Sequence, residues 1–136
     1  MNDLIFNTNA QFDDVSYDPN SNDWILTFSD SISVLISGFW RLLSNDHITL
    51  VSLDHMHTFG LPGPVDLCGE LRNVLKSKKL LQVHVAKGTG DLKLTFTEEI
   101  EMEIFTSSTG YESYQFSISN KSYIGLGGGE IAIFSV

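Results

Sequence analysis

The sequence predicts an α+β protein dominated by antiparallel strands, in which two four-stranded pseudo-repeats form a curved sheet or half-barrel. One central helix, over about residues 64–79, is expected to pack on this sheet. Three observations predict the fold. Short runs of alternating apolar and polar residues, separated by turn residues, recur along the chain. Only one stretch has helical apolar spacing. Finally, residues 24–36 recur in altered form at 92–104.

The recurring stretch reads as a β-hairpin in both copies, because apolar residues alternate on each side of a short polar centre. Five of the thirteen aligned positions are identical: Leu26/Leu94, Thr27/Thr95, Phe28/Phe96, Ile32/Ile100 and Ile36/Ile104. With small gaps the similarity extends over residues 24–50 and 92–126, so each half is predicted to be a four-stranded antiparallel unit. Convergent strand patterning is the alternative to duplication.

The remaining elements follow from turn residues and alternation. Residues 4–17 predict an opening strand pair, or one strand with an irregular lead-in, and 18–23 is a dense Asn/Asp/Pro turn. The longest predicted loop is 53–63. Further strands are expected at 39–43, 47–52, 80–85, 111–118, 123–126 and 131–136.

The predicted helix has one apolar face, formed by Leu67, Cys68, Leu71, Val74 and Leu75. Pro64 is tolerated in its first turn, where a missing N–H costs nothing. Acidic residues lie near its start and lysines near its end, which matches the helix dipole. The helix is therefore expected to join the two halves and to bury its leucines against the sheet.

Length and composition indicate one domain, residues 1–136, with a substantial core. The chain is 42% hydrophobic and 18% charged, which excludes the disordered class. No apolar run reaches the roughly 18 residues of a membrane span, and the first residues lack a basic secretory signal. The single cysteine, Cys68, can form no intramolecular disulfide and favours a reducing compartment. We therefore expect a cytoplasmic protein without a membrane partner.

Charge is unevenly distributed over the chain, whose formal net charge is −9. Residues 1–66 contain nine Asp against Arg41 alone, and 94–136 contain six Glu against Lys121 alone, whereas 67–93 is net basic. Such a field repels nucleic acid and speeds encounter with a cationic partner. The alternative is that the charge serves solubility.

One acidic cluster is a candidate binding surface. Glu99, Glu101 and Glu103 alternate with apolar residues, so a strand would place the three carboxylates on one face. They either keep an exposed sheet face soluble or bind a basic partner. The candidate toxin-binding residues are Asp13, Asp14, Asp18, Glu99, Glu101 and Glu103.

No set of residues predicts catalysis, a metal or a cofactor. Asp54, His55 and His57 lie close together, but no third or fourth ligand stands at a useful spacing, so they read as loop residues. The glycine stretch 125–130 lacks the third glycine and the following helix of a phosphate-binding loop, so a hairpin turn is expected. Cys68 falls on the apolar helix face, where it behaves as a small hydrophobe. We expect no enzyme.

Four motifs resemble a group of small β-rich bacterial proteins encoded beside secreted polymorphic toxins, some of them immunity proteins: Trp24-x-Leu-x-Phe28, Phe39-Trp-Arg-Leu42, Tyr111-Glu-x-Tyr-Gln-Phe116 and Gly127-Gly-Gly-Glu130-Ile-Ala132. The resemblance spans roughly residues 12–136. It implies a cytoplasmic antitoxin, of the contact-dependent growth-inhibition type, that binds and blocks one toxin domain. It identifies no functional residues, because immunity proteins diversify their binding surfaces with their toxins.

The functional hypothesis is therefore an immunity protein that neutralises a cognate, basic toxin domain, most simply a nuclease, by covering its active or substrate-binding surface. The alternative is a small-molecule-binding β-module whose concave side is lined by Trp24, Phe28, Trp40 and Tyr114. Those aromatic residues are also consistent with plain core packing. A small enzyme centred on His55 and His57 ranks last.

Overall fold

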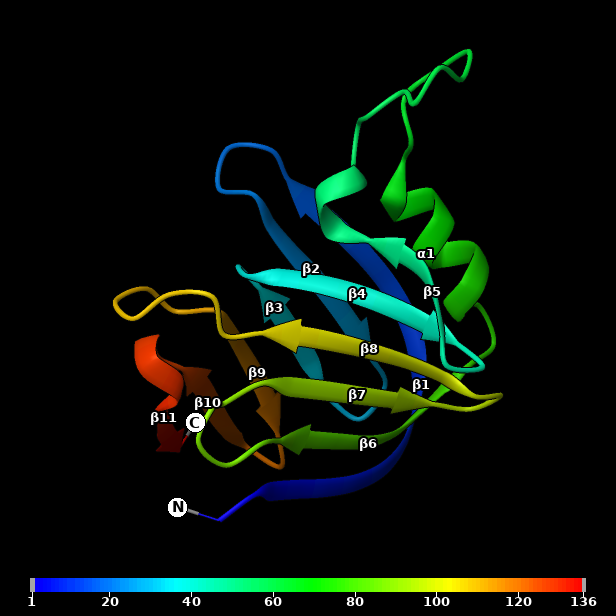
Figure 1. The fold of residues 1–136 in the computed structure, drawn as a ribbon. Helices are drawn as coiled ribbons and strands as arrows, with labels where there is room; N and C mark the ends of the chain where they lie inside the picture. Colours follow the sequence, from blue (N-terminus) through cyan, green and yellow to red (C-terminus); the bar gives the residue numbers. More distant parts are fainter. Residues whose placement is uncertain (1, 136) are drawn as a thin grey trace.

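The computed structural model describes residues 2–135, which form one curved antiparallel sheet and one α-helix (Figure 1). The strands are β1 (Leu4–Asp18), β2 (Asp23–Phe28), β3 (Ser33–Ile36), β4 (Phe39–Ser44), β5 (His47–Val51), β6 (Lys79–Val85), β7 (Leu92–Phe96), β8 (Ile100–Phe105), β9 (Tyr114–Ile118), β10 (Lys121–Gly125) and β11 (Ile131–Ser135). The helical segments are η1 (Ser52–Asp54), α1 (Leu67–Leu75) and η2 (Gly127–Gly129). The predicted fold, mostly antiparallel β with a single helix, is confirmed.

The sheet has the order β11-β10-β9-β3-β2-β1-β6-β7-β8-β4-β5 and is open, with β5 and β11 at its edges. β1 lies at the centre of this order. Its first part pairs with β6 and its second part with β2, and each ladder contains a register shift. The sheet bends there, so that β6, β7, β8 and β4 face β2, β3, β9 and β10 as a second layer (Figure 1).

The core fills the space between the two layers. Phe28 on β2 lies 6.1 Å from Phe96 on β7, measured between ring centroids, and Trp24 lies 5.2 Å from Trp40 on β4. The alternation in the sequence produces this arrangement, because every second side chain of β2, β3, β7 and β8 is buried.

Residues 4–18 are a single fifteen-residue strand rather than the predicted strand pair or irregular lead-in. The mixed apolar pattern of this stretch arises because β1 changes pairing partner along its length. Its register shifts lie between Asn7 and Ala10 and between Phe12 and Asp14. Such bulges interrupt strict alternation and bend the strand.

The predicted hairpins at 24–36 and 92–104 are both present, with Trp24 opposite Ile36 and Leu92 opposite Ile104. However, residues 24–50 and 92–126 do not each form a four-stranded unit. β3 pairs with β9, and β8 pairs with β4. Each hairpin is thus extended by strands from the other half of the chain, and this pairing does not confirm the internal repeat.

The helix is shorter than predicted, because Pro64 and Val65 precede it and Lys76 ends it. Its N-cap is Asp66, whose Oδ1 accepts the N–H groups of Cys68 and Gly69 at 3.1 and 3.3 Å. The leucines Leu67, Leu71 and Leu75 are buried as expected, and each contributes roughly 1.5–3 kcal/mol. No helix among residues 2–135 is long and apolar enough to cross a membrane.

The glycine stretch before β11 is a backbone contact, not a ligand loop. Gly128 and Gly129 have φ of +78° and +90°, and a strand follows, as predicted. A Cβ on Gly129 would collide with the carbonyl oxygens of Gly88 and Thr89. Glycine is therefore needed for both the turn and the close approach of two chain segments.

Candidate functional site

A hollow of about 470 Å³ lies where several loops meet at one end of the sheet. Its lining comes from four segments: Tyr17, Asn22 and Trp24; Ser37, Gly38 and Phe39; Ser52, Leu53 and His55; and Ser107. We call the surface formed by residues 18–23, 37–39, 52–66 and 106–112 the loop end. Antiparallel strands place their connections at the two ends of a sheet, which is why these distant segments meet.

His55 attaches the longest loop to this end of the sheet. Its ring lies 4.6 Å from that of Tyr17 and 4.9 Å from that of Trp24, both edge-on. Its Nδ1 accepts the N–H of Leu67, the first residue of α1, at 3.2 Å. Burial lowers the pKa of His55, although Asp66 opposes this more weakly. The neutral imidazole is thus a structural acceptor for the helix start.

The loop beyond His55 is an ordered projection. Met56 donates its N–H to the carbonyl of Val65, and Val65 donates to that of His57, both at 2.8 Å, while Leu61 donates to Thr58 at 2.7 Å. Met56 and Phe59 have positive φ, +67° and +49°, which is rare for side chains of this size. The backbone is therefore held in a specific conformation, at a cost that such bonds offset.

This projection exposes apolar side chains. Leu53, which precedes the projection, and Met56, Phe59 and Leu61 within it are 70%, 59%, 64% and 57% exposed; Tyr111, on the 106–112 segment of the loop end, is 82% exposed. Clustered apolar side chains at a surface mark a binding site more often than scattered ones do. The sequence prediction missed these residues. The signal that could have found them was four large apolar residues in a loop that is rich in Gly and Pro and has neither strand nor helix periodicity.

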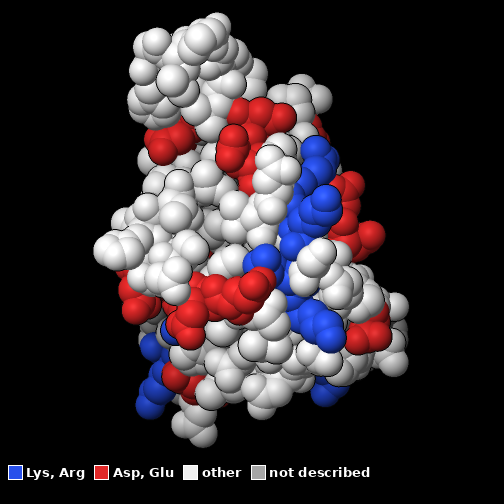
Figure 2. Space-filling view, turned by 90° about the vertical axis from the view of Figure 1, so that its right-hand side faces the viewer, with Lys and Arg blue, Asp and Glu red and all other residues white. Residues whose placement is uncertain are grey.

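The loop end is also uniformly acidic. Its segments contain Asp18, Asp23, Asp54, Asp66 and Glu112 and no Lys or Arg. Asp18 and Asp23 stand directly opposite each other in the β1–β2 ladder, a like-charge pairing that costs stability. Figure 2 shows the projection as an uncharged cap with acidic side chains below it, and a band of Lys and Arg begins beside these and runs down that face.

The six predicted toxin-binding residues do not form one patch. Asp18 lies on the loop end, whereas Asp13 and Asp14 lie earlier in β1, away from that end. The three glutamates lie at β8, which is separated from β1 by β6 and β7. Glu99 precedes β8, in a turn with φ of +61°, so it does not share a strand face with Glu101 and Glu103 as predicted.

Three of these six carboxylates already have cationic neighbours. Glu103 accepts a hydrogen bond from Arg41 Nε at 2.6 Å, and Glu101 lies 4.0 Å from Lys93 Nζ. Arg72 Nε donates to Asp14 at 2.7 Å, which lowers the pKa of that carboxyl group. Paired charges attract a cationic partner less than free ones do, so whether these residues bind a partner stays a prediction.

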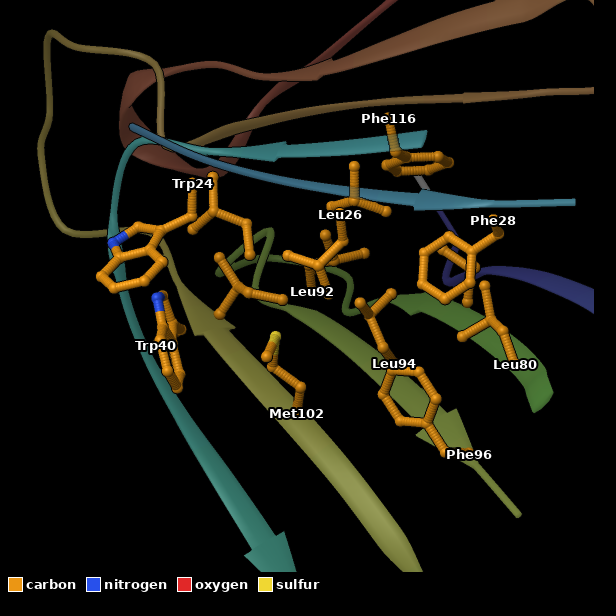
Figure 3. Close-up of a cluster of buried hydrophobic side chains, with 14 of the residues drawn as sticks. Trp24, Leu26, Phe28, Trp40, Leu80, Leu92, Leu94, Phe96, Met102 and Phe116 are labelled. Atoms are coloured by element: carbon orange, nitrogen blue, oxygen red, sulfur yellow. The ribbon is translucent and has the colours of Figure 1, made fainter. Parts of the chain in front are cut away.

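The concave side of the sheet is filled by its own side chains (Figure 3). Trp24, Phe28, Trp40 and Tyr114, the predicted ligand-binding aromatic residues, are only 3%, 6%, 0% and 1% exposed. The Trp40 indole nitrogen, without a hydrogen-bond partner, faces the Trp24 ring at an interplanar angle of 90° (Figure 3). Tyr114 donates to the carbonyl of Gly90 at 2.8 Å, and burial raises its pKa. These four residues pack the core.

The described residues bring together no three His, Cys, Asp or Glu side chains that could hold a metal ion. The Nδ1 atom of His55 accepts the N–H of Leu67 at the start of α1, and the His57 ring stacks on Phe59 with centroids 5.6 Å apart. Burial raises the pKa of the Cys68 thiol, which makes it a poorer nucleophile. In the comparisons with known proteins, no family model, curated protein or solved structure matches this chain.

Proposed function

We propose that the protein is a cytoplasmic immunity protein that binds a cognate, basic toxin domain through the loop end and covers its active or substrate-binding surface. The single observation that carries this proposal is the combination of exposed apolar side chains and unbalanced acidic charge on the loop end. A cationic nuclease domain, which must itself bind nucleic acid, is the target that this surface fits best.

Two physical effects would operate at such an interface. The carboxylates of the loop end would attract a basic surface over several ångströms and raise the association rate. Leu53, Phe59 and Leu61 would then lose water on contact, and this removal of apolar surface from water favours association. The backbone hydrogen bonds of the projection keep it preorganised, which reduces the entropy cost of binding.

The test is affinity capture from the native cell with the wild-type protein and with a Phe59→Ser/Leu61→Ser double variant. We expect the wild type to retain a basic protein that is released as salt rises, and the double variant to lose it. That protein should be toxic when expressed alone and harmless when the wild type is co-expressed. An Ile48→Ser variant is the matched control, because Ile48 on β5 is similarly exposed, at 54%, but lies off the loop end.

Recovery of no basic protein, or equal recovery by the double variant, would contradict the proposal. A second candidate function is then favoured by the hollow itself, whose volume of about 470 Å³ is in the range of small-molecule sites. Native mass spectrometry of the purified protein, which would reveal a retained small molecule, separates the two candidates.

A further inference from the structure

β11 is an edge strand without the usual protection against pairing. It bonds to β10 on one side, and no strand among residues 2–135 pairs with its other side (Figure 1). Its five residues include no charged residue and no proline, and its ladder with β10 has no register shift. Ile133 and Phe134 are 53% and 54% exposed. Natural edge strands usually carry a charge, a proline or a bulge that blocks association.

The opposite edge, β5, differs in these respects. The ladder between β5 and β4 contains a register shift between Leu42 and Leu43. The first residue of β5 is His47, an ionisable residue, whereas β11 has none. β5 also runs directly into η1, which turns the chain away. Only β11 therefore offers a regular, uncharged template.

The backbone of β11 offers its free groups symmetrically. Leu126 donates its N–H to the carbonyl of Glu130 at 2.8 Å, which makes this a hydrogen-bonded pair of the β10–β11 ladder. Bonded and non-bonded pairs alternate in antiparallel ladders, so Ala132 and Phe134 also bond to β10. The N–H and C=O groups of Ile131, Ile133 and Ser135 consequently point to the free edge, evenly placed about Ile133.

We propose that two copies of the chain pair through β11, antiparallel and centred on Ile133. A two-fold axis at this residue brings Ile133 opposite Ile133 of the second copy and Ile131 opposite Ser135, so every free N–H meets a free C=O. On the outer face, Phe134 of each copy lies opposite Ala132 of the other, so a large side chain meets a small one. The strand is thus complementary to itself.

The charge distribution permits a second copy at this strand. Two chains of net charge −9 repel each other, and the uncharged strand lets them meet without bringing carboxylates of that strand together. A basic partner would instead be drawn to the acidic loop end. Salt should strengthen association between copies, because it screens their repulsion. It should weaken binding to a cationic protein, because it screens the attraction between them. The dimer therefore does not depend on the proposed function.

Analytical ultracentrifugation from micromolar to millimolar concentrations tests the inference. The average mass of the wild type should rise from one chain toward two, and should do so more readily at higher salt. Ile133→Lys should keep the mass of one chain, whereas Ile48→Lys, a change at an equally exposed position on the other edge, should still associate. A wild type that keeps one-chain mass throughout, or a dimer that Ile133→Lys leaves intact, overturns the proposal.

Hydrogen exchange of the wild type gives a second readout that needs no variant. The amides of Ile131, Ile133 and Ser135 should exchange more slowly as concentration rises, whereas those of Ala132 and Phe134, already bonded to β10, should change little. Association without slower exchange at Ile133 would place the contact elsewhere and overturn the proposal.

Discussion

The Nδ1 atom of His55 accepts the N–H of Leu67 at 3.2 Å, so one imidazole joins the projecting loop to the start of the only α-helix among the described residues. The contact requires the neutral ring, since a protonated imidazole has no acceptor. Acid should therefore weaken the attachment of the loop end.

His55 should make stability depend on pH. Its pKa in the folded protein is lowered by burial, so below the unfolded value the unfolded chain binds more protons than the folded one. The contribution is present above that value and is lost as pH falls through the folded pKa. Urea unfolding across mildly acidic pH should show this loss in the wild type and in His57→Gln. In His55→Gln that component should be absent, and a loss identical to that of the wild type would contradict the assignment.

The buried helix face should dominate the energetics of α1. Leu71→Ala removes a fully buried side chain and should lower the free energy of unfolding by about 2–5 kcal/mol. Asn73→Ala, on the exposed side, should stay within about 0.5 kcal/mol of the wild type. Chemical denaturation of the two variants checks this, and similar losses would show that the helix is placed incorrectly.

Two adjacent glycines should respond differently to the same substitution. Gly128→Ala meets open space and should cost only the strain of a positive φ, about 1 kcal/mol. Gly129→Ala has the same strain and also drives a Cβ against the carbonyl of Gly88, so its loss should be clearly larger. Thermal unfolding should rank wild type, Gly128→Ala and Gly129→Ala in that order. Equal midpoints for the two variants would mean that the backbone contact is not tight.

Charge reversal should separate stability from recognition. Glu103→Lys places a lysine between Arg41 and Lys93, which face it from the neighbouring strands, and should cost about 1 kcal/mol of stability. Glu112→Lys, exposed on the loop end, should change stability by less than about 0.5 kcal/mol. In stopped-flow measurements with the purified basic partner, the association rate should fall more for Glu112→Lys than for Glu103→Lys. The reverse order would move the interface to β8.

The apolar projection should matter for binding and not for folding. Phe59→Ser removes an exposed ring and should shift stability by less than about 0.5 kcal/mol. The same change should weaken partner binding by about tenfold or more, as expected for a central aromatic anchor. Calorimetric titration and urea unfolding of the same sample give both values, and an unaltered affinity would remove Phe59 from the interface.

Local patterning determined much of this protein in advance. Alternation in residues 24–36 and 92–104 predicted both hairpins, because a side chain on a strand faces the core at every second position. The spacing of Leu67, Leu71 and Leu75 predicted the helix face for the corresponding reason. The glycine turn before β11 was likewise predicted from local chemistry.

Only the tertiary structure decided which strands lie side by side and what that does to their side chains. β3 pairs with β9 and β8 with β4, exchanging the predicted units, because strand patterning specifies a buried face and not a neighbour. That pairing brings Arg41 to Glu103, sixty-two residues away, and so gives one of the predicted binding carboxylates a cationic partner within the protein. It also gathers four loops into the acidic, apolar end, since the ends of strands meet only once the sheet is assembled.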